Sequence, residues 1–204
     1  MSKIAIIGAT GRAGSQLLEE ALRRGHSVTA IARNTAKIGE RAGVVSQQLD
    51  ALDSEALTAA VAGHDAVICA AHFATVPADK VIAPVKAAGV KRLLVVGGAG
   101  SLLLPDNSRV IDSEGFPEEY LAEASAGALF LDVLLKEQDL DWTFLSPSAE
   151  FVETERTGQF RIGKDHLLFD ATGRSWISFT DYAIAMIDEV ETPQFSRQRF
   201  TVGY

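Results

Sequence analysis

The feature that most constrains the fold is an alternation of short, β-branched apolar runs with longer segments of helical pattern. The strand-like runs lie at residues 3–7, 27–31, 43–49, 66–70, 92–96 and 142–145. Helical patterns lie between them, near residues 12–24, 53–62, 78–88 and 118–138. Strands that alternate with helices of this length form parallel sheets through right-handed crossovers. The sequence therefore predicts an α/β fold with a doubly wound parallel sheet and helices on both faces.

Capping residues mark the expected helix ends. In LDSEALTAAVAGHD, Asp53 or Ser54 is suited to cap the helix, and Gly63 is suited to end it. Gly89 ends the next helix, just before a strand at 92–96 that is apolar almost throughout. Such a strand is expected at the centre of a parallel sheet that is covered on both faces.

The pattern changes after about residue 147. The segment FRIGKDHLLFDATGRSWISFTDYAIAMIDEV predicts short strands around an Ala-Thr-Gly-Arg turn, followed by a helix that Thr180 or Asp181 caps. RQRFTV predicts a last strand. Because no linker or repeat divides the chain, we expect one domain over residues 1–204, with a small C-terminal cap at about 147–180.

Charge and cysteine content narrow the class of protein. The formal net charge of −8 argues against a non-specific nucleic-acid binder and against a polybasic membrane-surface protein. Cys69 is the single cysteine, so no internal disulfide forms, which suits a reducing cytoplasm. We find no signal-peptide pattern, no apolar run of ~18 residues and no histidine pair of metal-binding spacing. These features predict a cytoplasmic protein without a membrane span or a metal.

Three glycines, Gly8, Gly11 and Gly14, follow the first strand-like run and open the first helical pattern, in IAIIGATGRAGSQLLEEAL. A glycine takes positive φ without strain and lets a phosphate approach the backbone. A helix N-terminus adds unpaired N–H groups and the positive end of a dipole. We therefore expect Gly8 to form a tight turn, Gly11 to admit a pyrophosphate and Gly14 to let the helix pack on the strand. The alternative is a plain strand–helix turn.

The residues after the second strand indicate which dinucleotide binds. NAD binders usually carry an acid there for the ribose 2′-hydroxyl, whereas TAIARNTAK has no acid and contains Arg33. Arg33 and Arg12 together would suit a 2′-phosphate, so NADP(H) is favoured and NAD(H) is the other candidate. The alternative for both arginines is a solvated side chain. Asp50 would accept a hydrogen bond from the adenine amine or cap the next turn.

Several stretches resemble the NmrA-like group of atypical short-chain dehydrogenase/reductases: IAIIGATGRAGS, VVGGAGSLLL, GFPEEYLAEA, LDWTFLSPSAEF, ERTGQFRIG and ISFTDYAIAMIDE. They cover nearly the whole chain and are most similar to small bacterial proteins named as NADH-flavin reductases. Human biliverdin-IXβ/flavin reductases share this architecture. The resemblance implies a Rossmann-like sheet that binds NADP(H) or NAD(H), with the substrate over the nicotinamide. The loop at 98–117 and the C-terminal cap would cover that substrate.

One departure from the wider superfamily concerns the general acid. Typical members use a serine with a Tyr-x-x-x-Lys pair, in which the lysine lowers the pKa of the tyrosine. Here Ala124 and Ala128 fall about where that pair is expected. Ser101 keeps the serine-like position, and Tyr120, one helical turn before Ala124, is the only nearby phenol. Without the pair, hydride transfer to a stacked flavin or quinone is favoured over ketone reduction, because solvent can supply the proton.

The acceptor site has a smaller set of candidates. His72 follows the fourth strand-like run and would contact the acceptor beside the nicotinamide, or else face solvent. Phe73, Phe116 and Phe151 lie in loops at the predicted sheet edge and would stack on a flat acceptor, or else fill the core of the cap. Ser101 would contact substrate or phosphate, or else cap a loop.

These arguments give a defined set of site residues. The expected cofactor-binding residues are Gly8, Thr10, Gly11, Arg12, Ala13, Gly14, Arg33, Asn34, Asp50, Ala51, Ala70, Ala71, Gly97 and Pro147. The expected catalytic residues are Ser101, His72 and Tyr120, and the expected substrate-binding residues are His72, Phe73, Ser101, Phe116 and Phe151.

The function that these residues predict is an NADPH-dependent reductase of a planar acceptor. FMN or FAD would serve as substrate rather than prosthetic group, and the protein would act as a monomer or homodimer with a small-molecule acceptor as its partner. One competing hypothesis is a redox sensor of the NmrA type that binds NADP(H) without turning it over. Another is an isomerase or epimerase, for whose large substrate domain the chain has little room.

Overall fold

A single eight-stranded sheet runs through the centre of the molecule in the computed structural model, which describes all residues 1–204. The strands lie in the order β3-β2-β1-β4-β5-β6-β10-β8, and all neighbours are parallel except β8, which runs antiparallel to β10. The bounds are β1 Lys3–Ile7, β2 Ser27–Ala32, β3 Val44–Gln48, β4 Ala66–Cys69, β5 Arg92–Val96, β6 Asp141–Ser146, β8 Arg161–Gly163 and β10 Gln198–Gly203. This is the predicted doubly wound, Rossmann-like order, with the chain reversing direction across the sheet between β1 and β4.

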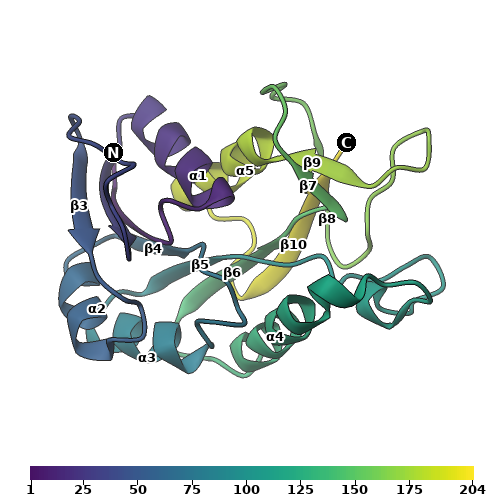
Figure 1. Cartoon of the computed structure of the whole chain (residues 1–204), viewed down its shortest axis with the longest axis horizontal. Helices are drawn as coiled ribbons and strands as arrows, with labels where there is room; N and C mark the ends of the chain where they lie inside the picture. Colours follow the sequence, from purple (N-terminus) through teal and green to yellow (C-terminus); the bar gives the residue numbers. More distant parts are fainter.

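Helices cover both faces of the sheet, as predicted (Figure 1). Helices α1 (Arg12–Arg23) and α5 (Phe179–Glu191) lie side by side on one face. Helices α2 (Ser54–Val61), α3 (Asp79–Ala87) and α4 (Glu118–Leu134) lie on the other, and one 3-10 turn spans Val110–Asp112. The sheet therefore forms the middle layer of three.

Each face of the sheet has its own apolar core. In β1, Ile4 and Ile6 belong to the core under α1 and α5, whereas Ala5 and Ile7 belong to the core under α2, α3 and α4. Alternate residues of a strand point to opposite faces, so a strand buried on both faces must be apolar throughout. Each fully buried Ile or Leu side chain stabilises the fold by about 1.5–3 kcal/mol. The central position predicted for β5 is confirmed, because it pairs with β4 and β6.

The predicted elements are confirmed, with differences at their ends. Asp53 caps α2 by accepting a hydrogen bond from the Ala56 N–H, and Gly63 and Gly89 follow their helices with positive φ. Helix α4 ends at Leu134, before the predicted 138. The chain continues there as a tighter turn, in which the Lys136 and Glu137 N–H groups bond to carbonyls three residues back.

The cap of α5 differs from the prediction. Ser178, not Thr180 or Asp181, caps the helix, because its hydroxyl accepts a hydrogen bond of 3.0 Å from the Asp181 N–H. The Asp181 carboxylate instead accepts hydrogen bonds from the backbone of Thr157 and Gly158. This fully buried carboxylate therefore fixes the preceding loop to α5.

The segment predicted as a C-terminal cap has two parts. Strands β7 (Glu150–Val152) and β9 (Trp176–Ser178) pair in parallel as a separate two-stranded sheet. Strand β8 joins the edge of the main sheet instead, so that part extends the sheet rather than covering it. None of the helices is both long and apolar enough to cross a membrane.

Candidate cofactor and substrate cleft

A cleft of about 820 Å³ opens where β1, β2, β4 and β5 end. In open parallel sheets, ligands bind outside the carboxyl ends of the strands at the point where the strand order reverses. The cleft volume lies in the range of small-molecule and cofactor sites. Many of the residues expected from sequence line this cleft: Gly8, Thr10, Gly11, Arg12, Ala13, Arg33, Asn34, Asp50, Ala51, Ala70, Ala71, His72, Phe73, Gly97 and Phe151.

The glycine loop has a geometry that two of its glycines require. Gly8 has a φ of +82°, and a Cβ there would lie 2.7 Å from the carbonyl oxygen of Ala70, which directly follows β4. A Cβ on Gly14 would lie 2.1 Å from the Gly8 carbonyl oxygen, so only glycine lets α1 approach the turn. Gly14 is buried behind the loop and does not line the cleft, which fits its expected packing role.

At Gly11, unlike at Gly8 and Gly14, neither the backbone conformation nor the packing requires a glycine. Its φ is −72°, and an added Cβ would have only the Gly8 carbonyl oxygen within 4 Å, at 3.3 Å. Gly11 is exposed and lines the cleft. The space beside it is therefore open to a ligand.

The backbone of the first turn of α1 offers hydrogen-bond donors to this space. The N–H groups of Arg12, Ala13 and Gly14 donate no hydrogen bond within the chain, as expected for a helix N-terminus. Such donors, with the helix dipole behind them, suit a phosphate.

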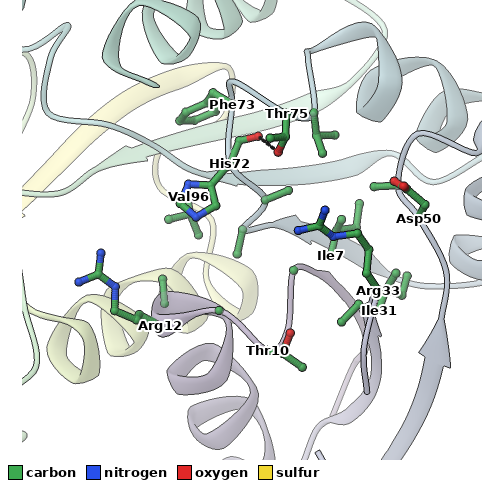
Figure 2. Close-up of a pocket in the computed structure, with 18 of the residues that line it drawn as sticks. Ile7, Thr10, Arg12, Ile31, Arg33, Asp50, His72, Phe73, Thr75 and Val96 are labelled. Atoms are coloured by element: carbon green, nitrogen blue, oxygen red, sulfur yellow. Dashed lines mark hydrogen bonds between the residues drawn. The ribbon is translucent and has the colours of Figure 1, made fainter. Parts of the chain in front are cut away.

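Arg12 and Arg33 lie at opposite ends of the cleft (Figure 2). The Arg12 guanidinium lies over the Phe179 ring, 5.4 Å from its centroid. Arg33 follows β2 and lies on the side of Asp50. The prediction that both arginines bind one 2′-phosphate does not match this separation, because Arg12 begins α1 and Arg33 follows β2 on the other side of the cleft.

Asp50 and Asn34 each support a turn at the cleft edge. One oxygen of Asp50 accepts a hydrogen bond from the Leu52 N–H at 3.0 Å, and the Asn34 side-chain oxygen accepts one from the Ala36 N–H at 3.0 Å. Both residues also line the cleft. Asp50 therefore caps this turn, which was the alternative prediction for it, and its second carboxylate oxygen is left for a ligand.

His72 projects into the cleft beside Glu123 of α4. The His72 side chain is 80% exposed, and its Nδ1 lies 3.4 Å from a Glu123 oxygen. The same carboxylate accepts hydrogen bonds from the Phe73 N–H at 2.8 Å and the Ala74 N–H at 2.9 Å. The Thr75 hydroxyl also donates to the His72 carbonyl, as the dashed line in Figure 2 marks. Helix α4 therefore holds the loop that carries His72.

Aromatic rings form a second part of the cleft wall. Phe151 and Phe179 line the cleft, with ring centroids 4.1 Å apart. Phe73 also reaches the cleft, but its ring is buried and packs against Phe130 and Phe144 in the core. Tyr182 packs behind Phe151, and its hydroxyl donates to the Leu145 carbonyl at 2.6 Å. Burial raises the pKa of Tyr182 and leaves this phenol structural.

Five of the predicted site residues lie outside the cleft: Gly14, Ser101, Phe116, Tyr120 and Pro147. The Ser101 hydroxyl accepts a hydrogen bond of 3.1 Å from Arg199, which also bonds to the Ser101 carbonyl. The Tyr120 side chain is exposed, and Pro147 is buried. The structure therefore does not bring Ser101 and Tyr120 together with His72.

Ten residues that line the cleft were not predicted from the sequence, and among them are the polar or aromatic side chains of Glu123, Thr75 and Phe179. Glu123 directly precedes Ala124, the position at which typical superfamily members are expected to carry the tyrosine. Neighbouring residues of a helix point about 100° apart, so that expectation did not indicate Glu123. Phe179 stands in the stretch ISFTDY, which marked the family without indicating which side chain faces the cleft. No cluster of three or more His, Cys, Asp or Glu side chains is arranged to hold a metal ion.

Known proteins share this fold. Residues 8–193 match the model of a family described as NAD(P)H-binding. The uncharacterised protein YwnB of Bacillus subtilis is 42% identical over 207 residues, which span 98% of this chain and 97% of YwnB. A structure from Bacteroides thetaiotaomicron, of a protein proposed to be an epimerase, is 42% identical with a TM-score of 0.94 over 99% of this chain and 96% of that one.

A further structure comes from Streptococcus pneumoniae, of a protein proposed to be an NADH-flavin reductase. It is 34% identical with a TM-score of 0.85, and the match covers 100% of this chain and 99% of that one. These matches agree with the resemblance to NmrA-like, atypical short-chain dehydrogenase/reductases that the sequence motifs indicate. The chain belongs to the NAD(P)H-binding family.

Proposed function

We propose that this protein is an NADPH-dependent reductase that transfers a hydride to a planar acceptor such as a flavin or a quinone. The observation that carries the proposal is the continuity of the cleft, which runs from the glycine loop to a wall formed by His72, Phe151 and Phe179. A dinucleotide on the glycine loop would leave this aromatic end for the acceptor. The protein's contribution would be to orient the two rings and exclude water.

The side chains at the acceptor end favour a stacked acceptor over a ketone. Reduction of a ketone needs a positioned acid for the developing alkoxide. Helix α4 presents Ala124 and Ala128 instead of a tyrosine and lysine, and Tyr120 lies outside the cleft. A flavin or quinone takes its proton from solvent or from the exposed His72. The family relative proposed to be an NADH-flavin reductase supports the same chemistry.

Arg33 supports NADPH over NADH. It directly follows β2, where NAD binders usually carry an acid, and its guanidinium makes no ion pair with the chain. A guanidinium binds a phosphate through charge-assisted hydrogen bonds.

The single cysteine is buried and unpaired, which supports the cytoplasm as the compartment where NADPH and acceptor meet.

The test is NADPH oxidation, followed by absorbance with excess FMN, with a protein-free blank and NADPH binding confirmed in the same sample. We expect turnover above the blank. A quinone serves as second acceptor if FMN fails. Tight NADPH binding without turnover on either acceptor would overturn the reductase and leave the NADP(H)-binding redox sensor in its place.

A further inference from the structure

Two arginines of this acidic chain stand apart from all the others. Every other arginine donates a hydrogen bond or lies in an ion pair within the chain. Arg12 and Arg33 do neither, and both line the cleft. In a protein with a net charge of −8, two guanidinium groups that form no ion pair in one cleft indicate two positions for anionic groups.

One dinucleotide does not account for both positions. A 2′-phosphate bound by Arg33 would lie at one end of the cleft, whereas Arg12 lies at the opposite end (Figure 2). The pyrophosphate has its own donors, the free N–H groups of the first turn of α1 beside Gly11. The Arg12 side chain extends away from these groups, over Phe179.

The position of Arg12 fits the acceptor rather than the cofactor. Its guanidinium lies against the face of Phe179, and Phe179 contacts Phe151, so charge and aromatic surface meet at one wall. A guanidinium held on a ring keeps its N–H edge free for hydrogen bonding. That wall would take a ligand with a flat ring and a separate negative charge.

We propose that Arg12 binds an anionic group of the acceptor, so that the natural acceptor is a planar compound that carries a phosphate or carboxylate. The inference rests on the proposed reductase function and adds the charge class of its substrate. FMN has this chemistry, whereas riboflavin has the same ring without the phosphate.

The test compares FMN with riboflavin at saturating NADPH in the wild type and in Arg12→Met, which keeps length and contact with Phe179 but removes the charge. Loss of a charge-assisted hydrogen bond is expected to lower kcat/KM for FMN by about 10- to 100-fold. The value for riboflavin should fall much less, so that the FMN-to-riboflavin ratio drops, and Arg12→Lys should restore part of the preference. Arg41→Met is the matched control, because it removes one exposed charge that pairs with Glu19 on the surface.

Two results would overturn the proposal. One is equal kcat/KM for FMN and riboflavin in the wild type. The other is an Arg12→Met variant whose KM for NADPH rises while the FMN-to-riboflavin ratio stays fixed, which would assign Arg12 to the cofactor. In both cases the reductase function would stand.

Flavin binding to the NADP⁺-loaded protein, measured by quenching of flavin fluorescence, separates the two proposals. Tighter binding of FMN than of riboflavin that depends on Arg12, without turnover of either, would support the anion site and overturn the reductase. Absence of both binding and turnover would overturn both.

Discussion

Arg33 is the residue on which the choice of cofactor depends. Replacing it with alanine removes the guanidinium without breaking a hydrogen bond or an ion pair, because the Arg33 side chain makes neither within the chain. We expect the KM for NADPH to rise about 10- to 100-fold, as for the loss of a charged hydrogen bond, and the KM for NADH to change little. Steady-state kinetics with the two cofactors measure this. Equal losses for both would show that Arg33 does not bind the 2′-phosphate.

Glu123 is a second residue with a definite expectation. In Glu123→Ala, the Phe73 and Ala74 N–H groups lose their acceptor, although water can partly replace it at this half-buried position. We expect the free energy of unfolding to fall by about 1 kcal/mol and kcat to fall more than the KM for NADPH rises. Urea unfolding and steady-state kinetics provide the two measurements.

Glu123→Gln is the matched variant, since its amide oxygen still accepts from one of the two N–H groups. It should recover most of the lost stability. If the alanine variant matched the wild type in both measurements, Glu123 would not hold the loop that carries His72.

Helix α1 provides a comparison at the scale of an element. Gly14→Ala would force a Cβ to 2.1 Å from the Gly8 carbonyl, so the helix must move away from β1, and we expect a loss of about 1–3 kcal/mol or more. Gly11→Ala meets one atom at 3.3 Å and should fold normally, yet bind NADPH more weakly because its methyl group projects into the cleft. Thermal unfolding and NADPH titration distinguish the two. Normal binding by Gly11→Ala would contradict a pyrophosphate beside it.

The elements themselves could be read from sequence because their signals are local. Apolar runs, glycines and a cap such as Asp53 act within a few residues, so the strands, the helices and the glycine loop were predictable. The cap of α5 was missed because Ser, Thr and Asp stand together there, and the long-range bonds of Asp181 to Thr157 and Gly158 decide among them.

The side-chain directions in the cleft were less predictable. Arg12 lies in the predicted motif, but its direction depends on Phe179, far along the chain. Ser101 lies in the predicted loop, but Arg199 of β10 binds it outside the cleft. Glu123 was missed because its partners, the N–H groups at 73 and 74, lie on another element.

At the scale of the whole molecule, Cys69 reports on global unfolding. It is buried in β4 in the middle of the sheet, and burial raises the pKa of its thiol to about 11. The unfolded thiol loses its proton near pH 8.5, so the unfolded state binds fewer protons above that pH and the free energy of unfolding falls as pH rises toward 11. We expect this alkaline loss to be smaller by about 1–3 kcal/mol in Cys69→Ala.

Urea unfolding of both proteins between pH 8 and pH 11 measures the difference. Alkylation by iodoacetamide at pH 8 offers an independent check, because Cys69 should react only as fast as the whole sheet opens. Rapid alkylation under native conditions would show that β4 opens locally.

The position of β10 in the sheet has a consequence for synthesis. This strand pairs with β6 on one side and β8 on the other, although both precede it in the sequence. While the nascent chain is on the ribosome, β6 therefore presents an open edge until residues 198–203 have emerged. Such an edge is a template for pairing with other chains. Chaperones that shield this edge during synthesis should therefore raise the yield of native protein.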